Sequence, residues 1–171
     1  MTDYHDFPDF NCNLLNKCKI KQYVDLMQKK YISYGNHTLK HSQKLNFCYK
    51  IKTNYSPSAY LDLTRSNPSR KTLVKLRISS HKLRIETGRY DNIPRDERLC
   101  NLCNCNRIED ETHFLLDCPS FSSTRDMFLS KLEPKIPFLC LQSHESLLSY
   151  LMNSTDYFIN IRLISFISTC L

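Results

Sequence analysis

The sequence predicts a mainly α-helical protein, built from short helices around one small cysteine-rich element. Apolar residues recur at helical spacing in several segments, and this periodicity is the primary signal for amphipathic helices. Only two glycines occur among 171 residues, too few for a Rossmann or phosphate-loop unit or for the turns of a many-stranded β protein. The nine cysteines are partly clustered, and we expect a minor β-hairpin at that cluster and helices elsewhere.

Short helices are expected in the first third of the chain. Asn13 can cap a helix over residues 14–32, because its side-chain oxygen can accept a hydrogen bond from a free backbone N–H. The alternation of apolar and polar residues in 45–51 fits either a strand or a short helix. Ser58 can cap a further short helix over residues 59–64.

A longer helix is predicted between Ser69, a suitable N-cap, and Gly88, which can supply the left-handed residue that ends many helices. Its apolar positions fall on one stripe: Leu73, Leu76 and Leu83. In the second half, the acidic run Glu109–Glu111 favours a helix start and predicts a helix over residues 110–117. Ser122 or Ser123 can cap the next helix. The remaining helical patterns cover residues 124–132, 145–152 and 157–169.

Charge is distributed unevenly along the chain. Residues 1–90 contain 17 Lys or Arg and 6 Asp or Glu, whereas residues 91–171 contain 7 and 11. A basic first half indicates a polyanionic partner such as RNA or DNA, bound without sequence specificity, and a Lys-rich solvated surface is the alternative. Seven basic residues form the densest group and are the predicted nucleic-acid contacts: Arg70, Lys71, Lys75, Arg77, Lys82, Arg84 and Arg89. Aromatic side chains in the same half could stack on unpaired bases, among them Tyr49, Tyr55 and Tyr60.

The cysteine cluster has the spacing of a metal site. Cys100, Cys103, His113 and Cys118 follow the pattern C-x2-C-x9-H-x4-C. Three thiolates and an imidazole suit tetrahedral zinc, and a C-x2-C turn places two ligands together, usually at the tip of a hairpin. Such a closed site supports folding and leaves no coordination position for hydrolysis. Buried cysteines and a core histidine are the alternative explanation, and Cys105, which would crowd the same turn, is interpreted as a spare thiol.

The sequence carries no persuasive catalytic motif. It lacks G-x-S-x-G, H-E-x-x-H and Walker patterns, and its scattered carboxylates form no recognisable two-metal site, so no catalytic residue is assigned. Residues 1–13 contain three aspartates and no basic residue, which is unlike a secretory signal. The apolar run at 157–171 is too short and too polar to span a bilayer. We therefore expect an intracellular protein, nuclear or cytoplasmic, with no membrane partner.

Three segments together resemble the zinc-binding region that follows the reverse transcriptase domain in non-LTR retrotransposon polyproteins. These segments are residues 75–90, 98–103 and 108–119, and the resemblance covers residues 70–126 closely and 15–69 loosely. Its specificity comes from three features that occur together: the quartet of Cys100, Cys103, His113 and Cys118, the Gly-Arg-Tyr at 88–90, and the Glu-Asp-Glu-x-His-Phe at 109–114. The resemblance implies nucleic-acid binding and the same four metal ligands. The family's polymerase and endonuclease lie upstream, so we expect a C-terminal remnant or a gene derived from one, and not an enzyme.

Three regions are predicted from these patterns. Residues 1–69 form a basic, loosely helical segment, residues 70–126 combine a basic helix with the zinc-binding knuckle, and residues 127–171 form C-terminal helices. The preferred function is a zinc-binding, non-catalytic nucleic-acid-binding module. The alternatives are a structural or protein-interaction zinc domain, whose docking surface would be the apolar helices at 145–152 and 157–169, and a retroelement remnant without retained function. The sequence identifies no protein partner.

Overall fold

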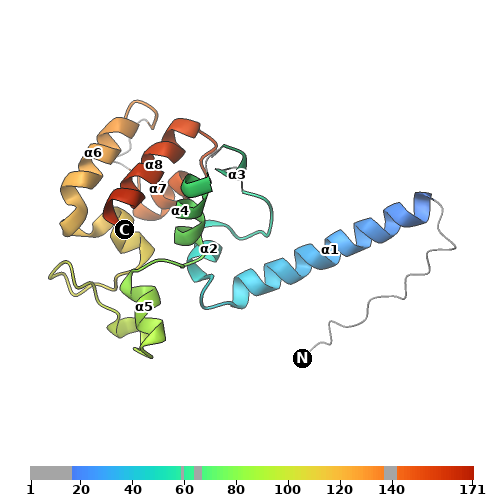
Figure 1. The fold of residues 1–171 in the computed structure, drawn as a ribbon, viewed down its shortest axis with the longest axis horizontal. Helices are drawn as coiled ribbons and strands as arrows, with labels where there is room; N and C mark the ends of the chain where they lie inside the picture. The colour runs from blue at the N-terminus through green and yellow to red at the C-terminus, as the bar shows by residue number, and fades with distance from the viewer. Residues whose placement is uncertain (1–16, 59, 64–66, 137–141) are drawn as a thin grey trace.

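The computed structural model describes residues 17–58, 60–63, 67–136 and 142–171, and it is mainly helical, as the sequence predicts (Figure 1). The α-helices follow in chain order: α1 (Lys17–His41), α2 (Asn46–Ile51), α3 (Tyr60–Leu63), α4 (Asn67–Arg77), α5 (Arg84–Tyr90), α6 (Ser122–Leu132), α7 (His144–Asn153) and α8 (Tyr157–Cys170). Tighter and wider helical turns complete the list: η2 (Arg95–Glu97), η3 (His113–Asp117) and η4 (Pro119–Phe121). The expected cap Asn13 and the end of the helix over 59–64 lie outside the described residues.

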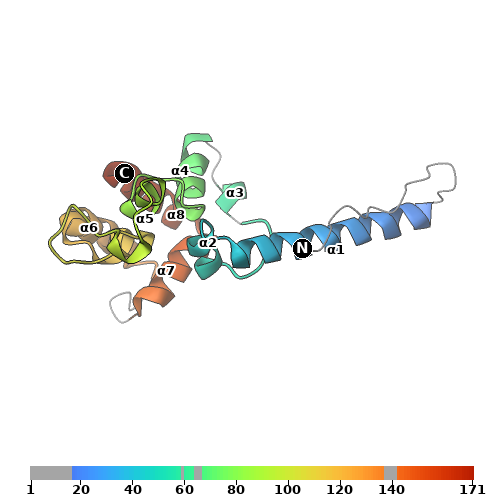
Figure 2. The ribbon, with the colours of Figure 1, turned by 90° about the horizontal axis from the view of Figure 1, so that it is seen from below.

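Helix α1 projects from the helical body as a long rod (Figures 1 and 2). The helix predicted over 14–32 continues to His41, and its last turns lie against α2. Leu39 is buried at that contact. The alternating segment 45–51 is helical, with Phe47 and Ile51 buried one turn apart on the same face of α2. The body therefore supports only the C-terminal end of α1.

One apolar cluster lies beneath α2, α4, α6, α7 and α8. Helix α8 is central to it, because it contacts α3, α4, α6 and α7. The ring of Phe166 stacks on Phe128 at a centroid distance of 5.2 Å and meets Phe114 at 5.6 Å. Phe47, Leu73 and Leu163 belong to the same cluster, so the regions divided at 69/70 and 126/127 do not have separate cores.

The single helix expected between Ser69 and Gly88 is wrong, because the chain leaves the helix after Arg77. Ser79 has φ of 48°, and the N–H groups of Ser79 and Ser80 donate to the carbonyls of Leu76 (3.3 Å) and Lys75 (2.7 Å). This pair of bonds around a left-handed residue is a Schellman C-cap, here formed without glycine. A new helix, α5, begins at Arg84 and contains Gly88 in its interior, so Gly88 is not the C-cap.

The acidic run Glu109–Glu111 caps two helical segments, where the sequence predicted one. Asp110 Oδ1 accepts from the N–H of His113 at 2.8 Å and caps the helical turns at 111–117. Glu109 Oε2 accepts from the N–H of Arg84 at 2.8 Å and therefore caps α5. Glu111 Oε1 accepts from the hydroxyl of Ser79 at 2.5 Å, which fastens the left-handed residue that ends α4. The buried acidic pair thus holds the break between α4 and α5 in place.

The three C-terminal helices confirm the predicted patterns over 124–132, 145–152 and 157–169. Ser143 caps α7 by accepting from the N–H of Ser146 at 3.2 Å, and Asp156 caps α8 by accepting from Phe158 at 2.7 Å. The predicted cap at Ser122 or Ser123 is wrong, because both residues lie inside α6, which has no side-chain cap. Within the described ranges, no helix has the length and apolar character that crossing a membrane requires.

The hairpin predicted at the C-x2-C is also wrong in its extent, because the described residues there contain no strand. Leu99 and Ile108 form one isolated antiparallel bridge. Around it, the N–H of Cys100 donates to Arg107 O at 2.8 Å, and the N–H of Glu109 donates to Arg98 O at 2.9 Å. The ladder ends there because residues 101–105 form an irregular loop. One bridge is sufficient to bring the two ends of this loop together.

Candidate metal centre

The structure brings the four predicted metal ligands together. The ligand atoms of Cys100, Cys103, His113 and Cys118 all lie within 4.8 Å of one another, and this group could hold a metal ion. The Sγ atoms of Cys100 and Cys118 are 3.9 Å apart, and Cys103 Sγ lies 3.3 Å from His113 Nε2. Metal–sulfur bonds of about 2.3 Å and metal–nitrogen bonds of about 2.0–2.1 Å would place tetrahedral S···S pairs about 3.8 Å apart and S···N pairs about 3.5 Å apart. The Cys100–Cys118 and Cys103–His113 distances match these values to within a few tenths of an ångström, and the other pairs lie within 4.8 Å.

Two local backbone features position the ligands. Cys100 lies beside the antiparallel bridge, and Cys103 lies in the loop that the bridge closes. His113 begins the π-helical turn η3 and Cys118 follows its end, with the N–H of Cys118 donating to His113 O at 2.7 Å. A π-turn bond closes over five residues instead of four, so it returns residue 118 to the side of the chain that carries residue 113. The wider turn explains how an H-x4-C spacing serves one site.

Charged side chains surround the cluster. Cys100 Sγ lies 3.7 Å from Glu109 Oε1, and Arg125 Nη2 donates to the carbonyl of Cys118 at 2.8 Å. Glu109 and Arg125 are both buried. The sequence pattern did not predict that Glu109 or Arg125 would lie beside the ligands.

The four ligands differ in how readily each adopts the protonation state that metal binding requires. Burial lowers the pKa of His113, which favours the neutral imidazole that a metal requires. The backbone N–H of Cys105 lowers the pKa of Cys103, whereas burial raises the pKa of Cys100 to about 12. Without a cation, Cys100 is therefore a protonated thiol, and its deprotonation would accompany metal binding. Cys105 is exposed and stands outside the four-residue group, consistent with its interpretation as a spare thiol.

The second ring nitrogen of His113, Nδ1, has an environment that the sequence pattern did not predict. Nδ1 is buried and has no hydrogen-bond partner within the described part of the chain. Metal-ligating histidines usually donate their second N–H to a carboxylate, a carbonyl or a water. The hydrogen bond that positions this residue is instead made by its backbone, because the amide N–H of His113 donates to Asp110 Oδ1.

The seven basic residues predicted to contact nucleic acid do not share one face. The helix that would have aligned them is broken between α4 and α5. Lys71, Lys75 and Lys82 are exposed, whereas Arg70 and Arg84 are half-buried. Arg89 pairs with buried Glu86 of its own helix, with Nη2 and Oε1 2.5 Å apart, and its guanidinium lies 4.5 Å from the centre of the Tyr90 ring.

Arg77 does not belong to a nucleic-acid-binding surface, because its side chain is buried. It is 3% exposed, and Nη1 donates to Met152 O, the carbonyl near the end of α7, at 2.6 Å. Its guanidinium lies 4.9 Å from the centre of the Tyr60 ring. Burial lowers the pKa of Arg77. The residue therefore joins α4 to α7 and the α3 region, which is a structural role.

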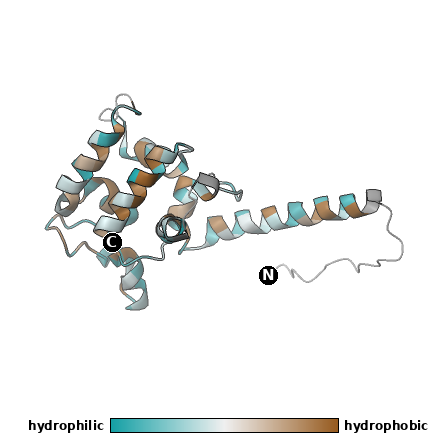
Figure 3. Ribbon diagram, turned by 45° about the horizontal axis from the view of Figure 1, so that its top comes forward, coloured by the Kyte–Doolittle hydropathy of each residue, from teal (hydrophilic) through white to brown (hydrophobic). Residues whose placement is uncertain are grey.

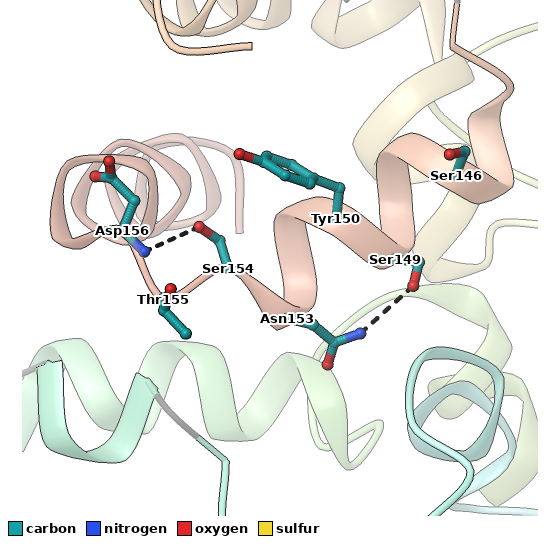
Figure 4. A pocket seen from close by; sticks show the side chains of 7 residues that line it. All are labelled: Ser146, Ser149, Tyr150, Asn153, Ser154, Thr155 and Asp156. Atoms are coloured by element: carbon teal, nitrogen blue, oxygen red, sulfur yellow. Dashed lines mark hydrogen bonds between the residues drawn. The ribbon is translucent and has the colours of Figure 1, made fainter.

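A hollow lies at the turn between α7 and α8 (Figure 4). Its lining combines apolar and polar surface and comes from Ser146, Ser149, Tyr150, Asn153, Ser154, Thr155 and Asp156. Asn153 Nδ2 donates to Ser149 Oγ, and the N–H of Asp156 donates to Ser154 Oγ. The carboxylate of Asp156 already caps α8 and pairs with Lys135. Among these described lining residues, no nucleophile is paired with a base.

Comparison with known proteins does not extend this assignment. No protein-family model, no curated protein and no solved structure matches the chain. The candidate metal centre therefore rests on its own geometry, with four ligand atoms close enough together to hold a single ion.

Proposed function

We propose that this protein is a zinc-stabilised, non-catalytic nucleic-acid-binding module. The convergence of Cys100, Cys103, His113 and Cys118 on one point carries the proposal. Zinc is the cation that three thiolates and one imidazole at tetrahedral spacing suit best. Because the protein supplies all four ligands, no coordination position is left for a substrate or for an activated water, so the ion's role is structural.

The position of the cluster supports a folding role for zinc. Cys118 is fully buried, and it follows Phe114 and Leu115, which belong to the apolar core. Cys100 and Cys103 come from the loop on the far side of the single bridge. This loop has almost no regular backbone hydrogen bonding of its own. A bound ion would therefore join it to the core of the body. Structural zinc contributes on the order of 10–16 kcal/mol in small modules.

Nucleic acid is the partner that charge and resemblance favour. The chain has a net charge of +7, concentrated in its first half, and residues 70–126 resemble the zinc-binding region downstream of retrotransposon reverse transcriptases. The protein-interaction alternative relied on α7 and α8 as a docking surface. Most apolar side chains of these two helices are buried in the core, which argues against α7 and α8 as that docking surface.

Binding at two or more salt concentrations tests this function. Labelled RNA and DNA of matched sequence, single- and double-stranded, would be titrated with the full chain and followed by fluorescence anisotropy. The logarithm of the association constant should fall linearly with the logarithm of salt, with a slope near −0.9 for each phosphate neutralised on duplex DNA and about −0.7 on single strands. Failure to bind any of the four probes, or an affinity independent of salt, would contradict the proposal.

A further inference from the structure

The surface most suited to a polyanion lies on α1 and the segment after α2, outside the residues 70–89 that the sequence singled out. Residues 17–58 contain nine lysines and one acidic residue, Asp25. In the 70–89 segment, by contrast, Arg77 is buried and Arg89 is paired with Glu86. Before its last turns, helix α1 stands clear of the body, and both apolar and polar residues occur along its length (Figures 2 and 3).

A groove of about 390 Å³ lies where α1 meets the segment after α2, and three tyrosines line it. Tyr31 is 68% exposed, Tyr34 52% and Tyr55 50%. Its floor is apolar and includes Leu39, Leu45, Cys48 and Ile78. Exposed aromatic faces over an apolar floor are a surface on which bases stack, and the volume is within the roughly 300–1,000 Å³ of small-molecule sites.

Specific contacts fix the position of Tyr55 on one side of the groove. The N–H of Tyr55 donates to Asn36 Oδ1 of α1 at 2.6 Å. The Tyr55 ring lies directly on Gly35, where a Cβ atom would overlap it. Lys52 Nζ donates to the carbonyls of Ser56 and Pro57, at 2.6 and 2.9 Å. These bonds close residues 52–57, which include Tyr55, into a compact turn. The ring of Tyr55 is thus positioned by the fold and is not a loose surface side chain.

The tyrosines continue an apolar stripe along α1. Spacings of four and three residues place these positions on one face: Ile20, Val24, Met27, Tyr31 and Tyr34. Successive helical residues turn by about 100°, so Lys21 and Lys30 flank the stripe on its two sides, while Lys29 and Lys40 lie on the opposite side of α1. Pairing of this face with a second copy would bring lysines together without glutamates to match them. Phosphates alongside stacked bases match both the charge and the aromatic faces.

We propose that this surface, the tyrosine groove and its flanking lysines, is a binding site for single-stranded nucleic acid. Unpaired bases stack on Tyr31 and Tyr55, and Lys21 and Lys30 neutralise the phosphates of the same strand. Because stacking uses a face that every base possesses, binding is tolerant of sequence. This assignment rests on the proposed nucleic-acid-binding function and names its ligand class and its place in the fold.

The test compares matched tyrosine variants of the full chain. Labelled single strands of RNA and of DNA, each of about 12 nucleotides, would be titrated with wild type, Tyr31→Ala, the double variant Tyr31→Ala/Tyr55→Ala, and a control, Tyr150→Ala/Tyr157→Ala. The control removes two exposed tyrosines from α7 and α8. Loss of one stacked base should weaken binding by about 5- to 150-fold, while the control should stay within about twofold of wild type. The two probes distinguish RNA from DNA as the preferred strand.

A charge variant provides the second arm. Lys21→Gln/Lys30→Gln should weaken binding and reduce the salt slope by about one to two, and Lys29→Gln/Lys40→Gln should do so less. If wild type binds single strands and the Tyr31→Ala and Lys21→Gln/Lys30→Gln variants bind equally well, the groove assignment is wrong while the proposed function stands. If wild type binds no nucleic acid, the proposed function fails. If Tyr31→Ala instead converts a dimer to a monomer in sedimentation, the surface is a protein interface and the assignment is overturned.

Discussion

Replacing Arg77 with alanine should destabilise the protein strongly, because its guanidinium links α4 to the end of α7 inside the core. Removal leaves the buried carbonyl of Met152 without this donor, which costs about 1–3 kcal/mol. It also removes the cation from the Tyr60 ring, worth about 0.5–2 kcal/mol. Relief of the desolvation that lowers the pKa of Arg77 offsets part of this loss. We therefore expect a net loss of about 2–4 kcal/mol.

Urea unfolding followed by far-ultraviolet circular dichroism measures this change. With a slope of about 2 kcal/mol per molar urea, the midpoint should fall by about 1–2 M. Lys75→Ala is the matched control, because Lys75 is an exposed basic residue on the same helix, and it should change stability by less than about 0.5 kcal/mol. Equal stability of the two variants would refute the buried placement of Arg77. So would a selective loss of nucleic-acid affinity in Arg77→Ala with stability unchanged.

Two further predictions concern local packing and charge. Gly88→Ala should destabilise the protein by about 1–3 kcal/mol in the same urea assay, because the new Cβ would lie 2.8 Å from Arg98 Cγ. Helix propensity alone predicts a gain in stability of roughly 1 kcal/mol, and such a gain would contradict this packing. Asp156→Ala should cost about 1 kcal/mol by removing the cap of α8. The hydrogen bond from Lys135 lowers the pKa of Asp156, so its contribution is present above the ordinary carboxyl pKa and is lost as pH falls through the lowered value. Asp156→Asn should weaken this acid dependence, and an unchanged pH profile would count against the ion pair.

The cluster of candidate metal ligands was predictable from sequence because its information is local. All four ligands lie within nineteen residues of one another, and the pattern needs only ligand types and spacing. The order and type of most helices were predictable for the same reason, since periodicity and caps act within a few turns. The hairpin was over-predicted because a C-x2-C turn fixes the closeness of its two arms and does not fix the length of the ladder beyond them.

The break between α4 and α5 was not predictable in this way. The stripe of Leu73, Leu76 and Leu83 continues across it, and all three are buried. What stabilises the break is distant in sequence, namely the bonds from Ser79 to Glu111 and from Arg84 to Glu109. The burial of Arg77 depends in the same way on a carbonyl that lies 75 residues further along the chain. Charge patterning alone could not separate this arginine from exposed lysines on the same helix.

The metal content of two cysteine variants tests the central claim most directly. Protein purified without an affinity tag would be analysed by inductively coupled plasma mass spectrometry, for wild type, Cys103→Ser and the matched control Cys105→Ser. We expect about one zinc per chain in wild type and in Cys105→Ser, and loss of metal with local unfolding around residues 98–120 in Cys103→Ser. Full metal content and unchanged stability in Cys103→Ser, or no zinc in wild type, would contradict the account.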